Sequence, residues 1–235
     1  MTYIESRVPV NLESFKEVLR SIKFCEILGI KNVILEPKKY LSKIPLNFKK
    51  KVQKETDIKI YYRINLRVND YQEFKSKIRN FNKFGDILSV ESLSKEVQLQ
   101  SAKDSRVDIL SFSDPEILKT LTPGVISLTK QNKSFVEFSL APIMIKDRTS
   151  QSKNFRNLYK FIQLSLKLKA NYLISGNFTD LFDYRHPRSL VSISNSLLGI
   201  PLNMAKKGYM DNPKRLIEKI KIPHDKNFEQ GVKLI

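Results

Sequence analysis

Residues 175–190, SGNFTDLFDYRHPRSL, bring together side chains of the types that perform hydrolysis or bind anions. Asp180, Asp183 and His186 are of the kinds that ligate divalent metals in hydrolases. Arg185 and Arg188 lie among them, and a guanidinium group can bind a phosphate through two parallel hydrogen bonds. The stretch therefore predicts either a metal-dependent hydrolytic site or an anion-binding loop.

A hydrolytic centre needs more ligands than this stretch supplies. With only two histidines, His186 and His224, a cluster of two or three zinc or manganese ions is disfavoured. A magnesium site made of carboxylates on predicted strands stays open, and its candidate ligands are Glu5, Glu36, Glu91, Asp108 and Glu137. For each of them an ion pair with a neighbouring lysine or arginine is the more common role, and we expect such pairs here.

Other motifs of known chemistry are missing from the sequence. It contains no GxSxG elbow for a serine nucleophile, and neither GxGxxG nor GxxxxGK[ST] for a nucleotide. Its single cysteine, Cys25, lies in an apolar helical stretch and is predicted to be a buried, inert thiol. One cysteine cannot form an internal disulfide, so we expect a reducing, cytoplasmic compartment.

The charge of the chain favours a polyanionic partner. Forty-two lysines and arginines oppose 24 acidic residues, which gives a formal net charge of +18. The partner that such an excess attracts most often is nucleic acid. An anionic membrane surface is the main alternative partner. A third interpretation is a lysine-rich, solvated surface that binds no polyanion. No apolar run approaches the ~20 residues that cross a bilayer, so we expect no membrane partner.

Residues 146–160, KDRTSQSKNFRNLYK, combine cations with aromatic side chains, as RNA-binding surfaces do. Arg148 comes first, and a helix is predicted to begin near Ser152. In that helix Lys153, Arg156 and Lys160 share one side through their i, i+3, i+7 spacing. The sequence alone leaves an ordinary solvated helix face equally open.

Short apolar runs alternate with amphipathic helical patterns along the chain, which predicts an α/β fold. The strand candidates are residues 2–6, 32–36, 58–68, 87–93, 107–112, 134–140 and 171–176. The length, near the ~250 residues of a TIM barrel, favours a (β/α) barrel over an open doubly wound sheet. We expect one barrel domain over residues 1–222, with seven clear strands and an irregular C-terminal closure, and a loosely ordered tail over 223–235.

The groups that follow these strands are mostly basic or hydroxylic. In a barrel the functional residues gather where strands end, and the side chains at those positions are Arg7, Lys38, Arg67, Glu91, Ser113, Arg148 and Asn177. Such a set does not indicate a hydrolytic site.

Three segments in order carry a family resemblance: SFVEFSLAPI, NFRNLYKFIQLSLKLKANYLISG and DLFDYRHPRSLVSISNSLLGI. Together they resemble ribonuclease P protein component 3, the TIM-barrel subunit of archaeal and eukaryotic ribonuclease P, whose fold is related to PHP phosphoesterases. MTYIESRVPV, GIKNVILEP and RVDILSF sit where the first, second and fifth strands of that family are expected. The resemblance covers residues 1–220, weakly between 38 and 85.

The same resemblance implies that the metal site of the PHP enzymes is lost. Where those enzymes carry H-x-H after the first strand, this chain reads Tyr3-Ile4-Glu5-Ser6. Where they carry D-x-H near the last strands, it reads Asp183-Tyr184-Arg185. Glu137 matches a metal-binding glutamate whose companions are absent. His186 is then expected to start a helix ahead of Pro187, and Asp183 to orient an arginine.

The resemblance also implies a function: a subunit that binds ribonuclease P RNA and supports removal of the 5′ leader from precursor tRNA. Its expected partners are that RNA, precursor tRNA, a small ribonuclease P protein subunit and the other subunits. The chain itself would be non-catalytic and bind no cofactor, Mg²⁺ being held by the RNA. The residues expected to contact RNA are Arg185, Arg188, Arg148, Lys153, Arg156 and Arg7. A stand-alone PHP-like metal-dependent phosphoesterase and a protein-binding scaffold are the alternatives.

Overall fold

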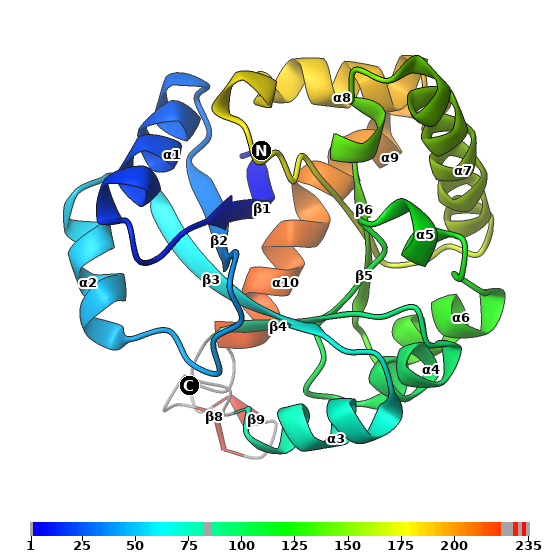
Figure 1. The fold of residues 1–235 in the computed structure, drawn as a ribbon, viewed down its shortest axis with the longest axis horizontal. Coiled ribbons are helices and arrows are strands. Elements are labelled where there is room, and N and C mark those ends of the chain that lie inside the picture. The colour runs from blue at the N-terminus through cyan, green and yellow to red at the C-terminus, as the bar shows by residue number, and fades with distance from the viewer. Residues whose placement is uncertain (1, 82–85, 222–227, 230–231, 234–235) are drawn as a thin grey trace.

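Seven parallel strands form the centre of the protein and helices surround them (Figure 1). The computed structural model describes residues 2–81, 86–221, 228–229 and 232–233. The strands of the central sheet are β1 (Ile4–Val10), β2 (Asn32–Pro37), β3 (Lys59–Arg67), β4 (Ile87–Glu91), β5 (Ile109–Ser111), β6 (Phe135–Ser139) and β7 (Tyr172–Ser175). Each strand pairs with the next one along the chain, in the order β1 to β7.

The helices lie outside the strands, as in a (β/α) barrel (Figure 1). They are α1 (Phe15–Ile27), α2 (Leu46–Lys54), α3 (Tyr71–Arg79), α4 (Lys95–Lys103), α5 (Pro115–Leu118), α6 (Pro123–Gln131), α7 (Arg148–Lys167), α8 (Pro187–Ser196), α9 (Leu202–Tyr209) and α10 (Asp211–Lys221), with the 3₁₀ turns η1 (Ala141–Ile143) and η2 (Leu181–Asp183). The predicted α/β barrel with seven strands is confirmed.

The seam between β7 and β1 is where the barrel closes irregularly. In the described part of the chain six strand pairings run from β1 to β7, and none joins β7 to β1. A side chain bridges the gap instead, because the Gly176 N–H donates to Oε1 of Glu5 at 3.0 Å. The barrel is therefore nearly closed, with a carboxylate where a strand ladder would otherwise continue.

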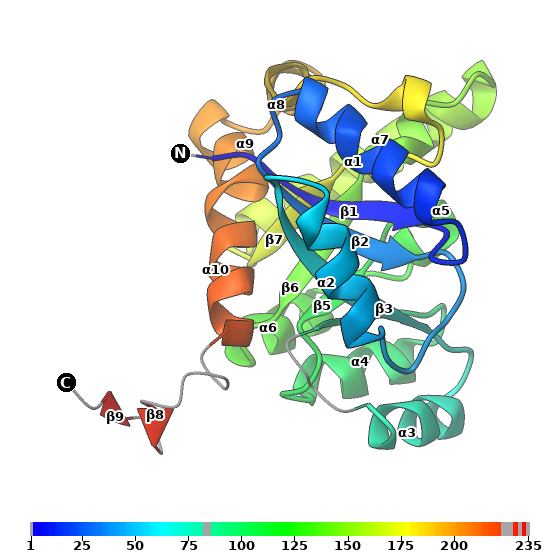
Figure 2. The ribbon, with the colours of Figure 1, turned by 90° about the vertical axis from the view of Figure 1, so that its left-hand side faces the viewer.

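The strands are apolar almost throughout because both of their faces are buried. One cluster fills the barrel interior near the start of the strands: Ile4, Ile34, Ile87, Ile109, Phe135 and Leu173, with Leu216, Ile217 and Ile220 from α10. Figure 2 shows α10 crossing the end of the barrel at which β1 begins. The helix thus seals this end with one apolar face.

Local side-chain and glycine signals define several helix ends. The Asp70 carboxylate caps α3, and Asp114 caps α5 ahead of Pro115. His186 caps α8, since its Nδ1 accepts the Arg188 N–H at 3.2 Å. Gly29 takes the left-handed conformation after α1, with φ of 73°.

Other boundaries differ from the prediction. Helix α7 begins at Arg148 rather than near Ser152, because the Asp147 carboxylate accepts the Ser150 N–H at 2.9 Å and caps the helix there. Strand β1 extends to Val10, beyond the predicted 2–6. Most of the tail after Pro223 lies outside the described residues; within it, β8 (Phe228–Glu229) and β9 (Val232–Lys233) pair in antiparallel fashion. No described helix combines the length and the apolar character that crossing a membrane requires.

Candidate functional site

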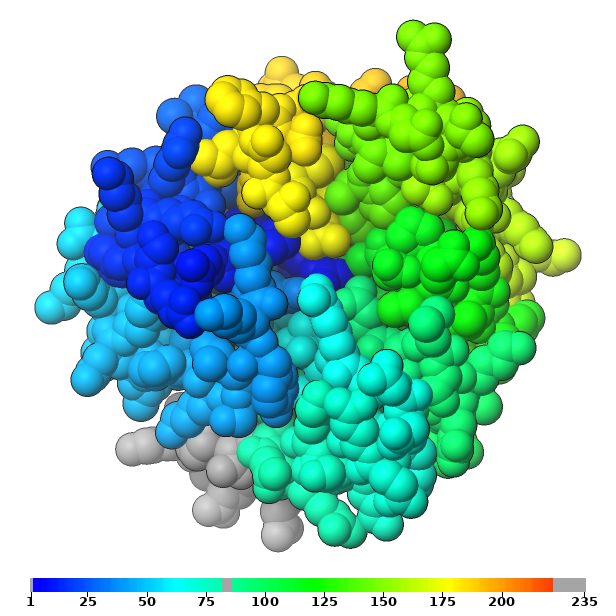
Figure 3. Space-filling view, viewed as in Figure 1, coloured from blue at the N-terminus to red at the C-terminus, as the bar shows by residue number. Residues whose placement is uncertain are grey.

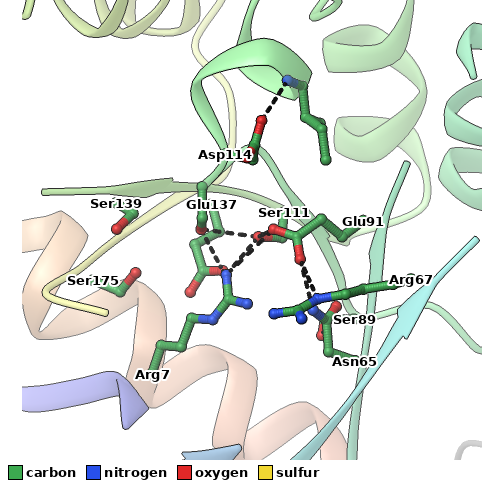
Figure 4. A network of polar contacts seen from close by, with 12 residues as sticks. Arg7, Asn65, Arg67, Ser89, Glu91, Ser111, Asp114, Glu137, Ser139 and Ser175 are labelled. Carbon is green, nitrogen blue, oxygen red and sulfur yellow. Dashed lines mark hydrogen bonds and ion pairs between the residues drawn. The ribbon is translucent and has the colours of Figure 1, made fainter. Parts of the chain in front are cut away.

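The barrel interior near the carboxyl ends of the strands is polar and charged (Figure 4). Its side chains come from six consecutive strands: Arg7 on β1, Glu36 on β2, Arg63 and Asn65 on β3, Ser89 and Glu91 on β4, Ser111 on β5 and Glu137 on β6. All of them are buried. Because the strands are parallel and adjacent, residues far apart in sequence meet at this level of the barrel.

Arg63 is at the centre of this network. Its Nη1 and Nη2 donate to the two carboxylate oxygens of Glu137 at 2.7 and 2.8 Å, which is the two-pronged geometry of the strongest arginine–carboxylate pairs. Its Nε lies 2.7 Å from Oε2 of Glu36 and 3.0 Å from Oγ of Ser89. The side chains of Arg63 and Glu137 are both fully shielded from solvent.

Arg7 completes the network from β1. Its Nη2 donates to Oε1 of Glu36 at 2.8 Å and its Nη1 donates to Oγ of Ser111 at 3.0 Å. Glu91 and Glu137 each lie 3.6 Å from Nη1. Only 2% of the Arg7 surface is exposed and its guanidinium is paired with carboxylates, so this geometry does not favour the predicted contact of Arg7 with RNA. The position of Arg7 at the end of a predicted strand indicated an accessible side chain, whereas the Arg7 side chain points into the barrel.

The charges of the network are balanced. Three carboxylates, Glu36, Glu91 and Glu137, face Arg7, Arg63 and the more exposed Arg67, whose Nε lies 3.1 Å from Glu91. Burial by itself would raise the pKa of Glu137, but Arg63 and Arg7 more than offset it and hold that pKa below its usual range. For Glu91, burial would also raise the pKa, but Arg7, the Asn65 amide and the arginines of β3 together outweigh it and lower that pKa. The lowered pKa values keep Glu91 and Glu137 ionised at neutral pH, and all three carboxylates are already bound to guanidinium groups.

The expected ion pairs of the strand carboxylates are present at four of the five positions. Glu36, Glu91 and Glu137 pair with arginines, and Asp108 lies 3.2 Å from Nζ of Lys219. Glu5 is different, because its carboxylate accepts hydrogen bonds from the Tyr3 hydroxyl and the Gly176 N–H, both at 3.0 Å. Within the described ranges, no three His, Cys, Asp or Glu side chains are grouped as a metal ion would require.

A cavity of about 460 Å³ opens above the network, at the mouth formed by the strand ends. Figure 3 shows this face of the molecule, hollowed near its centre. Five of the predicted strand-end residues line the cavity: Arg7, Arg67, Glu91, Ser113 and Asn177. Lys38 instead forms an ion pair with Glu17 at 2.8 Å, and Arg148 begins α7.

The 175–190 loop is held by its own backbone. The Arg185 Nη1 donates to the carbonyl oxygens of Phe182 and Tyr184 at 2.5 and 3.0 Å. Asp180 caps η2 by accepting the Phe182 N–H at 2.9 Å. Among the described contacts none joins Asp183 to an arginine, so the expectation that Asp183 orients one is not met. Arg188 is exposed at the start of α8.

The cations of α7 are all exposed: Arg148, Lys153, Arg156 and Lys160. Helices α7 and α8 are neighbours, because Arg156 and Phe155 share a groove with Ile193 and with Leu197, which follows α8. Arg188 and the α7 cations therefore lie on adjoining helices rather than at one point.

Sequence reasoning missed Arg63, the most connected residue of the interior. Its signal is the alternation of Arg63, Asn65 and Arg67 with Ile64 and Leu66 along β3, which puts three polar side chains on one face of the strand. In a barrel strand that face is the interior, so the alternation indicates a charged core.

Comparison with known proteins decides the family. The sequence model of the family described as RNase P subunit p30 matches residues 2–222. The chain belongs to the RNase P subunit p30 family. It is therefore a protein subunit of the ribonuclease P type, with a role in tRNA processing, and the resemblance found in the sequence is confirmed.

Individual relatives of this p30-family chain are distant in sequence. Ribonuclease P protein component 3 of Methanococcoides burtonii is 19% identical over 176 residues, which cover 74% of this chain and 72% of that protein. A chain in the structure of an archaeal ribonuclease P with mature tRNA has a TM-score of 0.75 at 16% identity, covering 99% of this chain and 97% of that one. The ochratoxinase of A. niger has a similar fold, with a TM-score of 0.57 at 9% identity over 92% of this chain and 71% of that enzyme.

Proposed function

We propose that this p30-family subunit binds the catalytic RNA of ribonuclease P and supports removal of the 5′ leader from precursor tRNA without catalytic groups of its own. One observation carries the second half of the proposal: two guanidinium groups, Arg7 and Arg63, occupy the interior at the level where the strand carboxylates converge. A divalent cation placed there would face two buried positive charges.

The oxygen atoms of Glu137 illustrate the difficulty for a metal-dependent reaction. Both accept hydrogen bonds from Arg63 in a fully buried pair. A metal that displaced Arg63 from Glu137 would leave the buried guanidinium without that partner, at a cost of about 3–5 kcal/mol. This argues against the stand-alone phosphoesterase, and we propose that the Mg²⁺ of the reaction belongs to the RNA.

For the RNA-contacting surface we propose the exposed cations of α7 and of the α8 start: Arg148, Lys153, Arg156 and Arg188, with the half-buried Arg185 beside them. Within the described residues no carboxylate pairs with any of the five, so their charge is available to phosphate groups. Arginine can hold a phosphate through two hydrogen bonds, and it also stacks on bases. The precursor tRNA, a small protein subunit and the other subunits of the complex complete the proposed assembly.

The test is reconstitution of precursor-tRNA cleavage with a variant carrying Arg185→Ala and Arg188→Ala. We expect cleavage at limiting Mg²⁺ to fall, because fewer phosphates are neutralised, while the thermal midpoint stays close to that of the unchanged chain. A variant carrying Arg20→Ala and Arg79→Ala removes two exposed arginines from α1 and α3 and is the matched control. Equal cleavage by the two variants at every Mg²⁺ concentration would reject this surface.

Phosphoesterase activity is the outcome that would reject the proposal as a whole. Stoichiometric metal found by elemental analysis of the purified chain, together with turnover of a phosphate ester, would identify a stand-alone enzyme instead.

A further inference from the structure

The turns that lead into β5, β6 and β7 form a second basic surface, on the end of the barrel opposite the strand-end cavity. This is the end that α10 crosses in Figure 2. We define its exposed cations as the basic arc: Lys103, Lys130, Lys133, Lys167, Lys169 and Arg215.

Hydrogen bonds link the neighbouring turns that carry the basic arc. The Asn132 Nδ2 donates to the carbonyl of Asp104 at 2.8 Å, which joins the turn before β6 to the turn before β5. The Val136 N–H of β6 donates to the carbonyl of Asn171 at 2.9 Å and joins the start of β6 to the turn before β7. Arg215 of α10 reaches the Asn171 side chain at 3.5 Å.

The cations of the arc are not neutralised by the chain. Across the described residues no carboxylate forms an ion pair with any member of the arc, and the nearby Asp104 is taken by Arg106 at 2.7 Å. Lysines at the opposite end behave differently, since Lys38, Lys39, Lys77 and Lys119 pair with Glu17, Glu13, Glu73 and Glu116. The basic arc therefore carries positive charge that no described ion pair offsets.

Two members of the arc have an unusual backbone. Lys133 and Lys169 follow α6 and α7 with φ of 55° and 53°, the left-handed conformation that normally calls for glycine after a helix. A side chain there costs about 1 kcal/mol relative to glycine, yet lysine occupies the position in two neighbouring turns. Attraction between lysine and the helix carboxyl end favours a cation there, but by only about 0.3–1 kcal/mol at an exposed site.

We infer that the basic arc is a docking surface for the phosphate backbone of structured RNA, separate from the surface on α7 and α8. This inference rests on the proposed function and adds to it that the chain contacts two RNA segments, one at each end of the barrel. Five of the six cations are lysines, which act as point charges on phosphates rather than as readers of bases. The contact is therefore independent of sequence and strongly dependent on salt.

The experiment measures binding of the full chain to ribonuclease P RNA transcribed in vitro, from 50 to 300 mM KCl. The arc variant carries Lys130→Gln, Lys133→Gln, Lys167→Gln and Lys169→Gln. The control carries the same change at the paired lysines Lys38, Lys39, Lys77 and Lys119. Each phosphate contact contributes about −0.9 to the slope of log affinity against log salt, so the arc variant should lose up to about 3.6 of that slope and bind at least ~10-fold more weakly.

Each outcome has a distinct meaning. If the arc variant and the control weaken binding equally, only net charge matters and the arc is rejected, while the proposed function stands. If the unchanged chain does not bind the RNA, the proposed function itself fails. Binding to vesicles containing phosphatidylserine that depends on the arc, with RNA binding unchanged, would assign the surface to membranes and overturn the inference.

A second variant separates RNA binding from helix capping. Lys133→Gly with Lys169→Gly relieves the left-handed backbone, so the thermal midpoint should hold or rise. RNA affinity should nevertheless fall, because two phosphate contacts are lost. Unchanged affinity would mean that these two lysines serve only the helix ends.

Discussion

Replacing Arg63 by Met tests whether the charged interior is a balanced network. Methionine fills a similar volume without charge. In this variant Glu137 stays fully buried, and the nearest cation of the network is Arg7, at 3.6 Å. Arg7 is itself paired with Glu36 at 2.8 Å. Removing one partner of a buried pair costs about 3–5 kcal/mol. In a chain of this size that should lower the thermal midpoint by roughly 6–20 °C.

The pH dependence of the loss gives a sharper test. In the unchanged chain Arg63 and Arg7 outweigh burial and depress the pKa of Glu137. The ionised Glu137 carboxylate therefore adds to the stability of the fold above its unfolded pKa, and this stability is lost as the pH falls. In Arg63→Met, burial is opposed by Arg7 and the Ser111 hydrogen bond without Arg63, and we expect the folded pKa of Glu137 to rise above its unfolded value. The stability of the variant then falls as pH rises, and the gap between the two proteins should be wider at pH 8 than at pH 5.

Urea unfolding at both pH values measures this gap. A second variant, Arg63→Met with Glu137→Leu, removes both charges and should recover at least about 2 kcal/mol of the loss, since apolar replacement of a buried pair is often neutral or stabilising. Additive losses in the double variant, or a single-variant loss below about 1 kcal/mol, would refute the argument that this pair balances the interior.

Three further predictions concern the rest of the barrel. Burial raises the pKa of Glu5 to about 7, although the hydrogen bond from the Gly176 N–H lowers it. The free energy of unfolding should therefore fall by roughly 3 kcal/mol between pH 4.5 and pH 8. In urea unfolding the Glu5→Gln variant should show a flatter dependence of this free energy on pH. Leu216→Ala on α10 leaves a cavity in the sealed end and should cost about 2–5 kcal/mol in urea unfolding, whereas a loss below 1 kcal/mol would deny that α10 seals the barrel. A Cβ at Gly208 would lie 2.9 Å from the Tyr172 ring, so Gly208→Ala should lower the thermal midpoint, whereas an unchanged midpoint would show that the contact relaxes freely.

The barrel was predictable because its signals are local. Apolar runs identify strands, and side-chain caps such as Asp70 and Asp114 mark where helices begin. The start of α7 was placed too late because the capping Asp147 lies in a run of polar residues where several starts look alike.

The charged interior was not predictable in the same way. Arg63 meets Glu137 across 74 residues of sequence, and Arg7 meets Glu36 across 29, so no short motif contains either pair. An arginine at the end of a strand is expected to be accessible to solvent. Arg7 is buried instead, because β1 continues to Val10 and its register against β2 shifts between Glu5 and Val8. Such a shift depends on the neighbouring strand.

The seal formed by α10 also sets an order of events during synthesis. The apolar layer that begins with Ile4 on β1 is covered by Leu216, Ile217 and Ile220, which a ribosome adds long after the first strand. Until those residues emerge, one end of the nascent barrel exposes isoleucines from four strands to solvent and to other chains. This layer of the growing polypeptide therefore stays unburied until α10 has been made, and the docking of α10 covers an aggregation-prone surface.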